Sequence, residues 1–131
     1  MSDKPFKKEN FIVLAAGIAG ACGVILAAVA AHLKSEPSIS TASQMLLFHA
    51  SSLLGLAAWA AHDSHYAWRT YRVACIMILG VILFAGDLCL RVFYNFTPFH
   101  YAAPLGGILM ILSWILISIF AFLRWIKSDL S

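Results

Sequence analysis

Four long apolar stretches, separated by short polar segments, dominate the chain. Their bounds are about 11–33, 44–61, 73–93 and 104–123. A helix needs roughly 20 residues to cross the hydrocarbon core of a bilayer. The stretches lack the two-residue alternation of membrane-barrel strands, and an open sheet would leave backbone groups unpaired in lipid. The pattern therefore predicts an all-α fold, a four-helix transmembrane bundle that forms a single integral membrane domain over residues 1–131.

The polar segments at 34–43, 62–72 and 94–103 are the predicted connections. Pro37 disfavours continuation of the first helix, and Pro104 suits the first turn of the fourth, where its missing N–H costs nothing. Small residues near Ala28 and Ala31 resemble a signal-peptide cleavage site, but the apolar stretch before them is longer than a signal-peptide core. We therefore expect the first stretch to be retained as a span.

Composition supports a membrane environment and excludes several soluble classes. Hydrophobic residues make up 62% of the chain and charged residues 11%, whereas a soluble domain has roughly 45–50% and about 25%. The basic residues flank the apolar stretches, which favours a lipid bilayer and not nucleic acid as the partner. Three cysteines, Cys22, Cys75 and Cys89, lie within apolar stretches without a CxxC pair, as packing residues do.

The distribution of lysine and arginine predicts the orientation. One side of the predicted topology carries seven basic residues and the other carries two. The positive-inside rule then places both termini in the cytoplasm. We expect the spans to lie in a bacterial inner (plasma) membrane. Tyr66, Trp68 and Tyr71 fall near a predicted interface, as an aromatic belt would. The basic residues are, on the first side, Lys4, Lys7, Lys8, Arg69, Arg72, Arg124 and Lys127, and on the second, Lys34 and Arg91.

Glycines mark the predicted helix contacts. Small residues let helix backbones approach closely in lipid, and this approach drives helix association. The packing positions that we predict are Gly17, Gly20 and Gly23 in the first span and Gly106 and Gly107 in the fourth. Because the first span is richest in small residues, we expect it to be the most buried of the four.

Ionisable residues within or beside the spans are the candidate functional groups. Asp87 and Arg91 are four residues apart and share one helix face, while His32, His49 and His100 are predicted on the same side of the membrane. The acid and base are interpreted as an ion pair, or as part of a proton, substrate or quinone site. The histidines suit a hydrogen-bonded structural layer, a haem or metal site, proton handling, or binding of a polar head group.

We predict that His32, His49, Asp87 and Arg91 point into the bundle and contact one another directly or through water. The chain contains no Ser-His-Asp pattern, no HExxH motif and no paired carboxylates. We therefore predict no enzyme activity, no catalytic residue, no metal site and no cofactor, with haem as the alternative. The loop histidines His62 and His65 are interpreted as solvated.

Several short motifs, in their order and spacing, resemble one family of membrane proteins. They are Ala30-Ala31-His32-Leu33, Phe48-His49-Ala50, Leu83-Phe84-Ala85-Gly86 and Ala103-Pro104-Leu105-Gly106-Gly107, followed by Trp114. The chain is similar over most of its length to the domain of unknown function 423 family, to which animal transmembrane protein 256 is related. The resemblance implies a small multi-pass membrane protein of uncharacterised role and draws attention to His32 and His49. Asp87 departs from the small polar residue that the family pattern leads us to expect.

Three functions remain open from the sequence. The first is a non-enzymatic structural or accessory subunit that packs with itself or with a larger membrane complex. The second is an oligomeric transporter of a small solute or protons, although an internal inverted repeat is not evident. The third is a haem- or quinone-associated redox protein that uses His32 and His49.

Overall fold

The structure, a computed structural model, describes residues 8–33, 36–63, 65–97 and 99–130. These segments form four α-helices, which confirms the predicted fold class. Residues 1–7, which include Lys4 and Lys7, and the predicted connection residues Lys34 and Pro98 lie outside the described residues. The helices are α1 (Lys8–His32), α2 (Pro37–His62), α3 (Ala67–Tyr94) and α4 (Ala102–Asp129).

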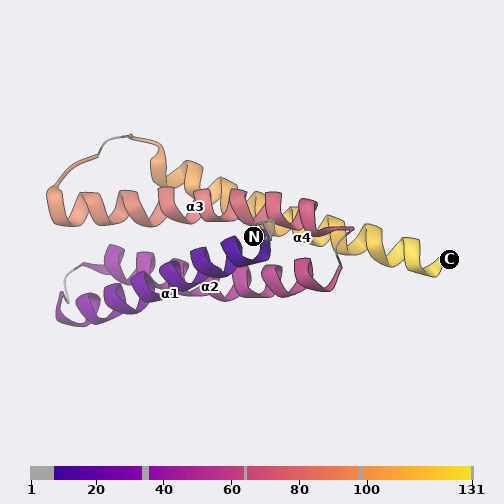
Figure 1. The fold of residues 1–131 in the computed structure, drawn as a ribbon. Helices are drawn as coiled ribbons and strands as arrows, with labels where there is room; N and C mark the ends of the chain where they lie inside the picture. Colours follow the sequence, from indigo (N-terminus) through magenta and orange to yellow (C-terminus); the bar gives the residue numbers. More distant parts are fainter. Residues whose placement is uncertain (1–7, 34–35, 64, 98, 131) are drawn as a thin grey trace, which may run out of the picture.

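The helices run up and down in two pairs (Figure 1). α1 packs on α2, α2 on α3 and α3 on α4, and α1 also touches α3. Across the described residues the backbone of α4 approaches only α3. The bundle is therefore not closed between α4 and α1, and each of these two helices has a broad face without a helix against it.

All four helices are longer than the apolar stretches that predicted them. Pro37 is the first residue of α2, so most of the segment expected as the first connection is helical. One reason is that the fixed φ of proline suits the first helical turn. Another is that the first two turns of α2 contain the buried residues Ile39, Ala42 and Ser43. α3 begins at Ala67, ahead of the predicted span, and ends at Tyr94; the next residue, Asn95, caps it in a left-handed conformation with a φ of 49°.

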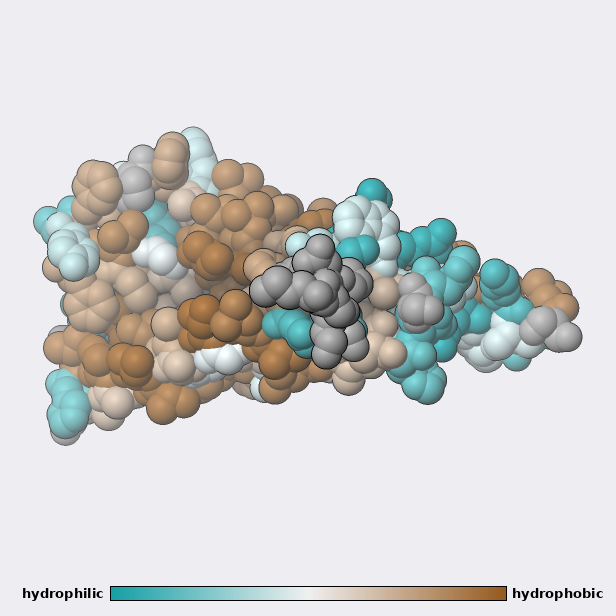
Figure 2. All heavy atoms as spheres, viewed as in Figure 1, coloured by the Kyte–Doolittle hydropathy of each residue, from teal (hydrophilic) through white to brown (hydrophobic). Residues whose placement is uncertain are grey.

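Length and composition make every helix in the described residues a candidate membrane span. Helices of 25 to 28 residues are about 38–42 Å long, longer than a hydrocarbon core of about 30 Å. Their ends must therefore reach the polar interface. Figure 2 shows this division, because hydrophobic residues cover most of the visible body and hydrophilic ones gather toward the end where α4 extends beyond the other helices.

Burial is concentrated in α2 and α3, which contradicts the expectation that α1 is the most buried helix. In the most apolar part of each helix, 39% of residues are buried in α2 and α3, against 17% in α1 and α4. The prediction was wrong because small residues surround much of α1, and only one side of it meets α2 and α3. Two apolar clusters fill the interior, one built around Ile12, Leu53 and Met77, the other around Leu46, Val81 and Met110.

Glycine permits the closest helix crossing, which joins α3 and α4. A Cβ on Gly106 would lie 2.6 Å from the carbonyl oxygen of Gly80 and 2.6 Å from the backbone nitrogen of Phe84. Gly23 is similarly confined, since a Cβ there would lie 2.8 Å from a side-chain carbon of Leu47 in α2. Gly20 lies opposite Ala50 at an ordinary contact distance.

Two of the five glycines predicted as packing positions meet no neighbour. A Cβ on Gly17 or on Gly107 would have no atom within 4 Å. Gly17 is exposed on α1, one helical position away from the side that meets α2. These two glycines therefore leave open surface on the described protein, and they do not pack its interior.

Candidate functional site

The charged pair predicted in α3 forms an ion pair with one buried and one exposed member. The Nε of Arg91 donates to Oδ2 of Asp87 at 2.8 Å, and the Nη2 of Arg91 lies 2.7 Å from the same oxygen. The side chain of Asp87 has no exposed area, whereas that of Arg91 is 40% exposed. Arg91 therefore carries its charge outward while neutralising a carboxylate inside the protein.

The second carboxylate oxygen of Asp87 has no hydrogen-bond partner within the described residues, although it is buried. Asp87 shares a face of α3 with Gly80 and Phe84, which contact α4 at Gly106. Because α3 and α4 are antiparallel neighbours, the next turn of α3 lies level with the first turn of α4. The positive end of the α4 dipole favours a carboxylate at that level.

His49 is the buried histidine, and both of its ring nitrogens are used. Its Nδ1 lies 2.8 Å from the carbonyl oxygen of Met45, and the indole N–H of Trp114 donates to its Nε2 at 3.4 Å. Since an indole nitrogen only donates, the proton of a neutral His49 belongs on Nδ1, where it is donated to Met45. The two rings also meet edge to face, with centroids 6.3 Å apart, so this contact ties α2 to α4.

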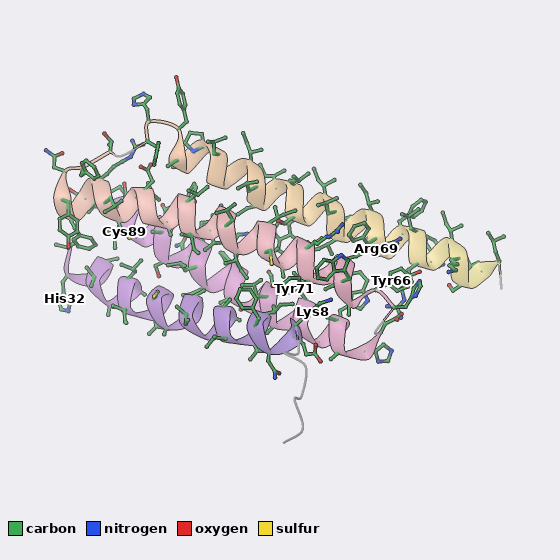
Figure 3. All side chains as sticks on the ribbon, turned by 45° about the horizontal axis from the view of Figure 1, so that its top comes forward. Lys8, His32, Tyr66, Arg69, Tyr71 and Cys89 are labelled. Carbon is green, nitrogen blue, oxygen red and sulfur yellow. The ribbon has the colours of Figure 1, made fainter. Side chains whose placement is uncertain are left out.

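The structure does not bring the predicted polar cluster together. His32 is exposed at the last residue of α1, and His100 is exposed in the turn before α4. Figure 3 shows His32 at the end of the bundle opposite to Lys8 and Tyr66. His49 is 12 residues beyond Pro37, about 18 Å along the axis of α2, so it lies far deeper than His32. Of the five residues predicted to form the cluster, only Asp87 and Arg91 contact each other.

Asp63, directly after α2, makes two polar contacts. The backbone N–H of His65 donates to Oδ1 of Asp63 at 3.0 Å. The other oxygen of Asp63 lies 3.1 Å from Nη2 of Arg124 in α4. No group of three potential metal ligands gathers in the described part of the chain. These contacts give the loop aspartate a structural role that joins α4 to the α2–α3 turn.

Two features were missed by sequence reasoning. The hydroxyl of Ser43 in α2 donates to the carbonyl oxygen of Gly23 in α1 at 2.7 Å in a buried position. Most other serines in these helices donate to a carbonyl one turn back in their own helix, as Ser51 and Ser113 do, so no sequence pattern distinguishes Ser43 from them. The second feature is a cluster of basic and aromatic side chains that joins α1 to α3. The sequence feature that could have indicated it is the run of aromatic and basic residues from Tyr66 to Arg72, taken together with Lys8.

Comparison with known proteins agrees with this architecture. A family model described as "Protein of unknown function (DUF423)" matches residues 19–107. The UPF0382 inner membrane protein YgdD of Escherichia coli K12 is 27% identical over 115 residues, which cover 82% of this chain and 86% of that protein. A UPF0382 membrane protein of Haemophilus influenzae is 28% identical over 115 residues, 82% and 90% of the two chains. No solved structure matches the chain.

The matched region begins within α1, includes all of α2 and α3, and ends in the first turns of α4. It therefore includes Gly23, His49, Asp87 and Gly106, the residues that carry the helix contacts and polar interactions described above. The family model and the four apolar helices lead to one conclusion: the chain is a multi-pass membrane protein that belongs to the DUF423 family.

Proposed function

We propose that the protein is a non-enzymatic accessory subunit that packs through α1 against a second copy or a larger membrane complex. The supporting observation is a row of small or short exposed residues along one side of α1. Gly17, Ala21, Val24 and Ala28 repeat at intervals of three and four and are all exposed, so they share one face. We call these four residues the α1 outer face.

The α1 outer face has the composition of a helix interface in lipid. Small residues let two backbones approach, and close van der Waals packing drives association where the hydrophobic effect does not. The inner side of the same helix already works in this way, because Gly20 and Gly23 pack against α2. Gly17 itself leaves open space on this face, since no atom lies within 4 Å of a Cβ built there.

Photo-cross-linking in the membrane tests this proposal. A photoreactive amino acid at Val24 samples the α1 outer face, and the same amino acid at Leu54 in α2 is the matched control. Both positions are apolar and exposed, at 61% and 51%. We expect a reproducible protein adduct from Val24 and none from Leu54. Adducts to lipid alone at both positions would contradict the proposal.

The orientation proposed for this subunit places both termini in the cytoplasm. This orientation follows from the distribution of basic residues, seven on one side of the predicted topology and two on the other, by the positive-inside rule. Reporter fusions at the C-terminus and in the loop near Trp68 should be active inside the cell, and fusions near Pro37 should be active outside. A C-terminal reporter active only outside would refute the orientation.

A second candidate function, proton or small-solute transport, is favoured by Asp87 alone. A buried carboxylate with an unpaired oxygen is a costly feature inside a membrane span and commonly marks a pathway. Purified protein in vesicles with an imposed pH gradient separates the two functions. Proton flux that Asp87→Asn abolishes would support transport and count against a purely structural role.

Neither candidate function includes a cofactor. An iron or quinone ligand at His49 would have to replace the hydrogen bond from Trp114 or the one to Met45. His32 lies too far along the bundle to serve as its partner. The absorption spectrum of protein purified from its native membrane checks this directly, and a haem Soret band lost in His49→Leu would overturn it.

A further inference from the structure

Two basic side chains from different helices lie against one tryptophan near the start of α3. The Nζ of Lys8 in α1 lies 3.8 Å from the centre of the Trp68 ring, and the guanidinium carbon of Arg72 lies 5.1 Å from it. Trp68 stacks on Tyr71, which in turn lies against Phe11 of α1. Figure 3 shows Lys8 and Tyr71 at the same end of the bundle.

The charges of Lys8 and Arg72 are not neutralised by the described protein. Their distances from one ring place them within about 9 Å of each other, close enough for their repulsion to matter. Neither makes an ion pair with an acidic side chain in the described ranges. An anion held beside the Trp68 ring by both side chains would offset this repulsion.

An apolar groove lies deeper along the same two helices. It lies between α1 and α3 with α2 as its floor, and it consists of two cavities of about 230 and 420 Å³. Cys22, Leu46 and Ile82 line both cavities, so the groove is continuous. Its nearest residues, Ala15 and Ile78, are seven residues from Lys8 and six from Arg72, about 9–10 Å deeper along the helices.

We propose that this surface binds an anionic phospholipid, with its phosphate between Lys8 and Arg72 and one acyl chain in the groove. The two parts are ordered as such a molecule requires, because the charged end lies beside an interfacial tryptophan and the apolar groove begins deeper along the same helices. A free phosphate would use the basic pair and leave the groove empty. An anionic lipid uses both, which is why the groove favours the lipid. The proposal is independent of the α1 outer face.

Native mass spectrometry of the full chain in detergent measures the binding. The probes are dioleoylphosphatidylglycerol, dioleoylphosphatidylcholine and inorganic phosphate. We expect the wild-type protein to prefer the anionic lipid by about 30-fold, from the attraction of two basic side chains for an anionic lipid. The double variant Lys8→Gln/Arg72→Gln should bind both lipids alike. The matched control Arg69→Gln/Lys127→Gln removes two charges from the same end and should keep the preference.

A second variant tests the groove separately. Ala15→Phe places a ring in the groove at the end nearest Lys8 and Arg72. It should weaken binding of the dioleoyl lipid while leaving the basic pair intact. Circular dichroism confirms that each variant folds. Three results would overturn the proposal: equal loss of preference in the control, displacement of the lipid by an equal concentration of inorganic phosphate, or unchanged lipid binding in Ala15→Phe. A change in the number of chains per particle, without a change in lipid preference, would assign this surface to a second copy and would also overturn it.

Discussion

Replacing Arg91 by glutamine is expected to destabilise the protein much more than replacing Asp87 by asparagine. Arg91→Gln leaves an unneutralised carboxylate whose side chain has no exposed area. Breaking a buried pair in this way costs about 3–5 kcal/mol, and the partial exposure of Arg91 places the cost at about 3 kcal/mol. Asp87→Asn leaves a guanidinium that already reaches the surface and can stay hydrated, so we expect a loss of about 1 kcal/mol.

The double variant Asp87→Asn/Arg91→Gln should lose less than the two single variants together. It contains neither charge, so the largest cost in Arg91→Gln, an isolated buried carboxylate, disappears. We expect a total loss of about 2 kcal/mol, which gives a coupling energy of about 2 kcal/mol. The assay is unfolding by sodium dodecyl sulfate in mixed micelles, followed by circular dichroism.

The ion pair between Asp63 and Arg124 supplies the control cycle. It has a comparable length of 3.1 Å, but both side chains are partly exposed, at 24% and 34%. Exposed pairs contribute about 0.2–1 kcal/mol, so the coupling in this second cycle should be much smaller. Strictly additive losses at Asp87 and Arg91, or equal coupling in the two cycles, would refute the reasoning from burial.

Three further substitutions test the helix contacts. Gly106→Ala should cost about 1–3 kcal/mol, because its Cβ would meet backbone atoms of α3. Gly107→Ala is the control and should be neutral. Similar losses of stability in the two variants, measured in the same unfolding assay, would contradict the close crossing of α3 and α4. Trp114→Phe removes the donor to His49 and should cost about 0.5–1 kcal/mol in that assay; no loss would mean that the bond is not formed. Ser43→Ala removes a contact between α1 and α2 and should cost a similar amount, about 0.5–1 kcal/mol, and an unchanged midpoint would argue against it.

The four helices were predictable because their signal is local. A run of apolar residues long enough to cross a bilayer allows few structures other than a helix, and the structure has four such helices in the described residues. Asp87 and Arg91 lie together for the same reason, since four residues on one helix always share a face. Helix ends were less predictable, because the first turns of α2 and α3 are polar in sequence and resemble connections. In the structure these turns are packed, since Ile39 and Thr70 are buried.

Contacts between helices depend on how each helix is rotated, and the sequence does not determine this rotation. Gly17 and Gly20 have the same composition signal, yet only Gly20 faces α2. His32 and His49 were grouped by their predicted depth, whereas the helical start of α2 at Pro37 places His49 several turns below His32. The partner of His49 is instead Trp114 on α4, 65 residues away in the chain. No local sequence pattern predicts a contact between residues so far apart.

The composition of the particle taken from the membrane tests the proposed accessory role most directly. Wild-type protein and the variants Gly17→Leu and Gly55→Leu would be extracted with their surrounding lipid into polymer-bounded discs and weighed by native mass spectrometry. Both glycines are exposed and have no atom within 4 Å of a Cβ, so neither substitution should disturb the fold. The account predicts that the wild-type protein and Gly55→Leu form particles with at least one further protein chain, and that Gly17→Leu forms the single 14.3 kDa chain. A single chain in all three preparations would contradict the account.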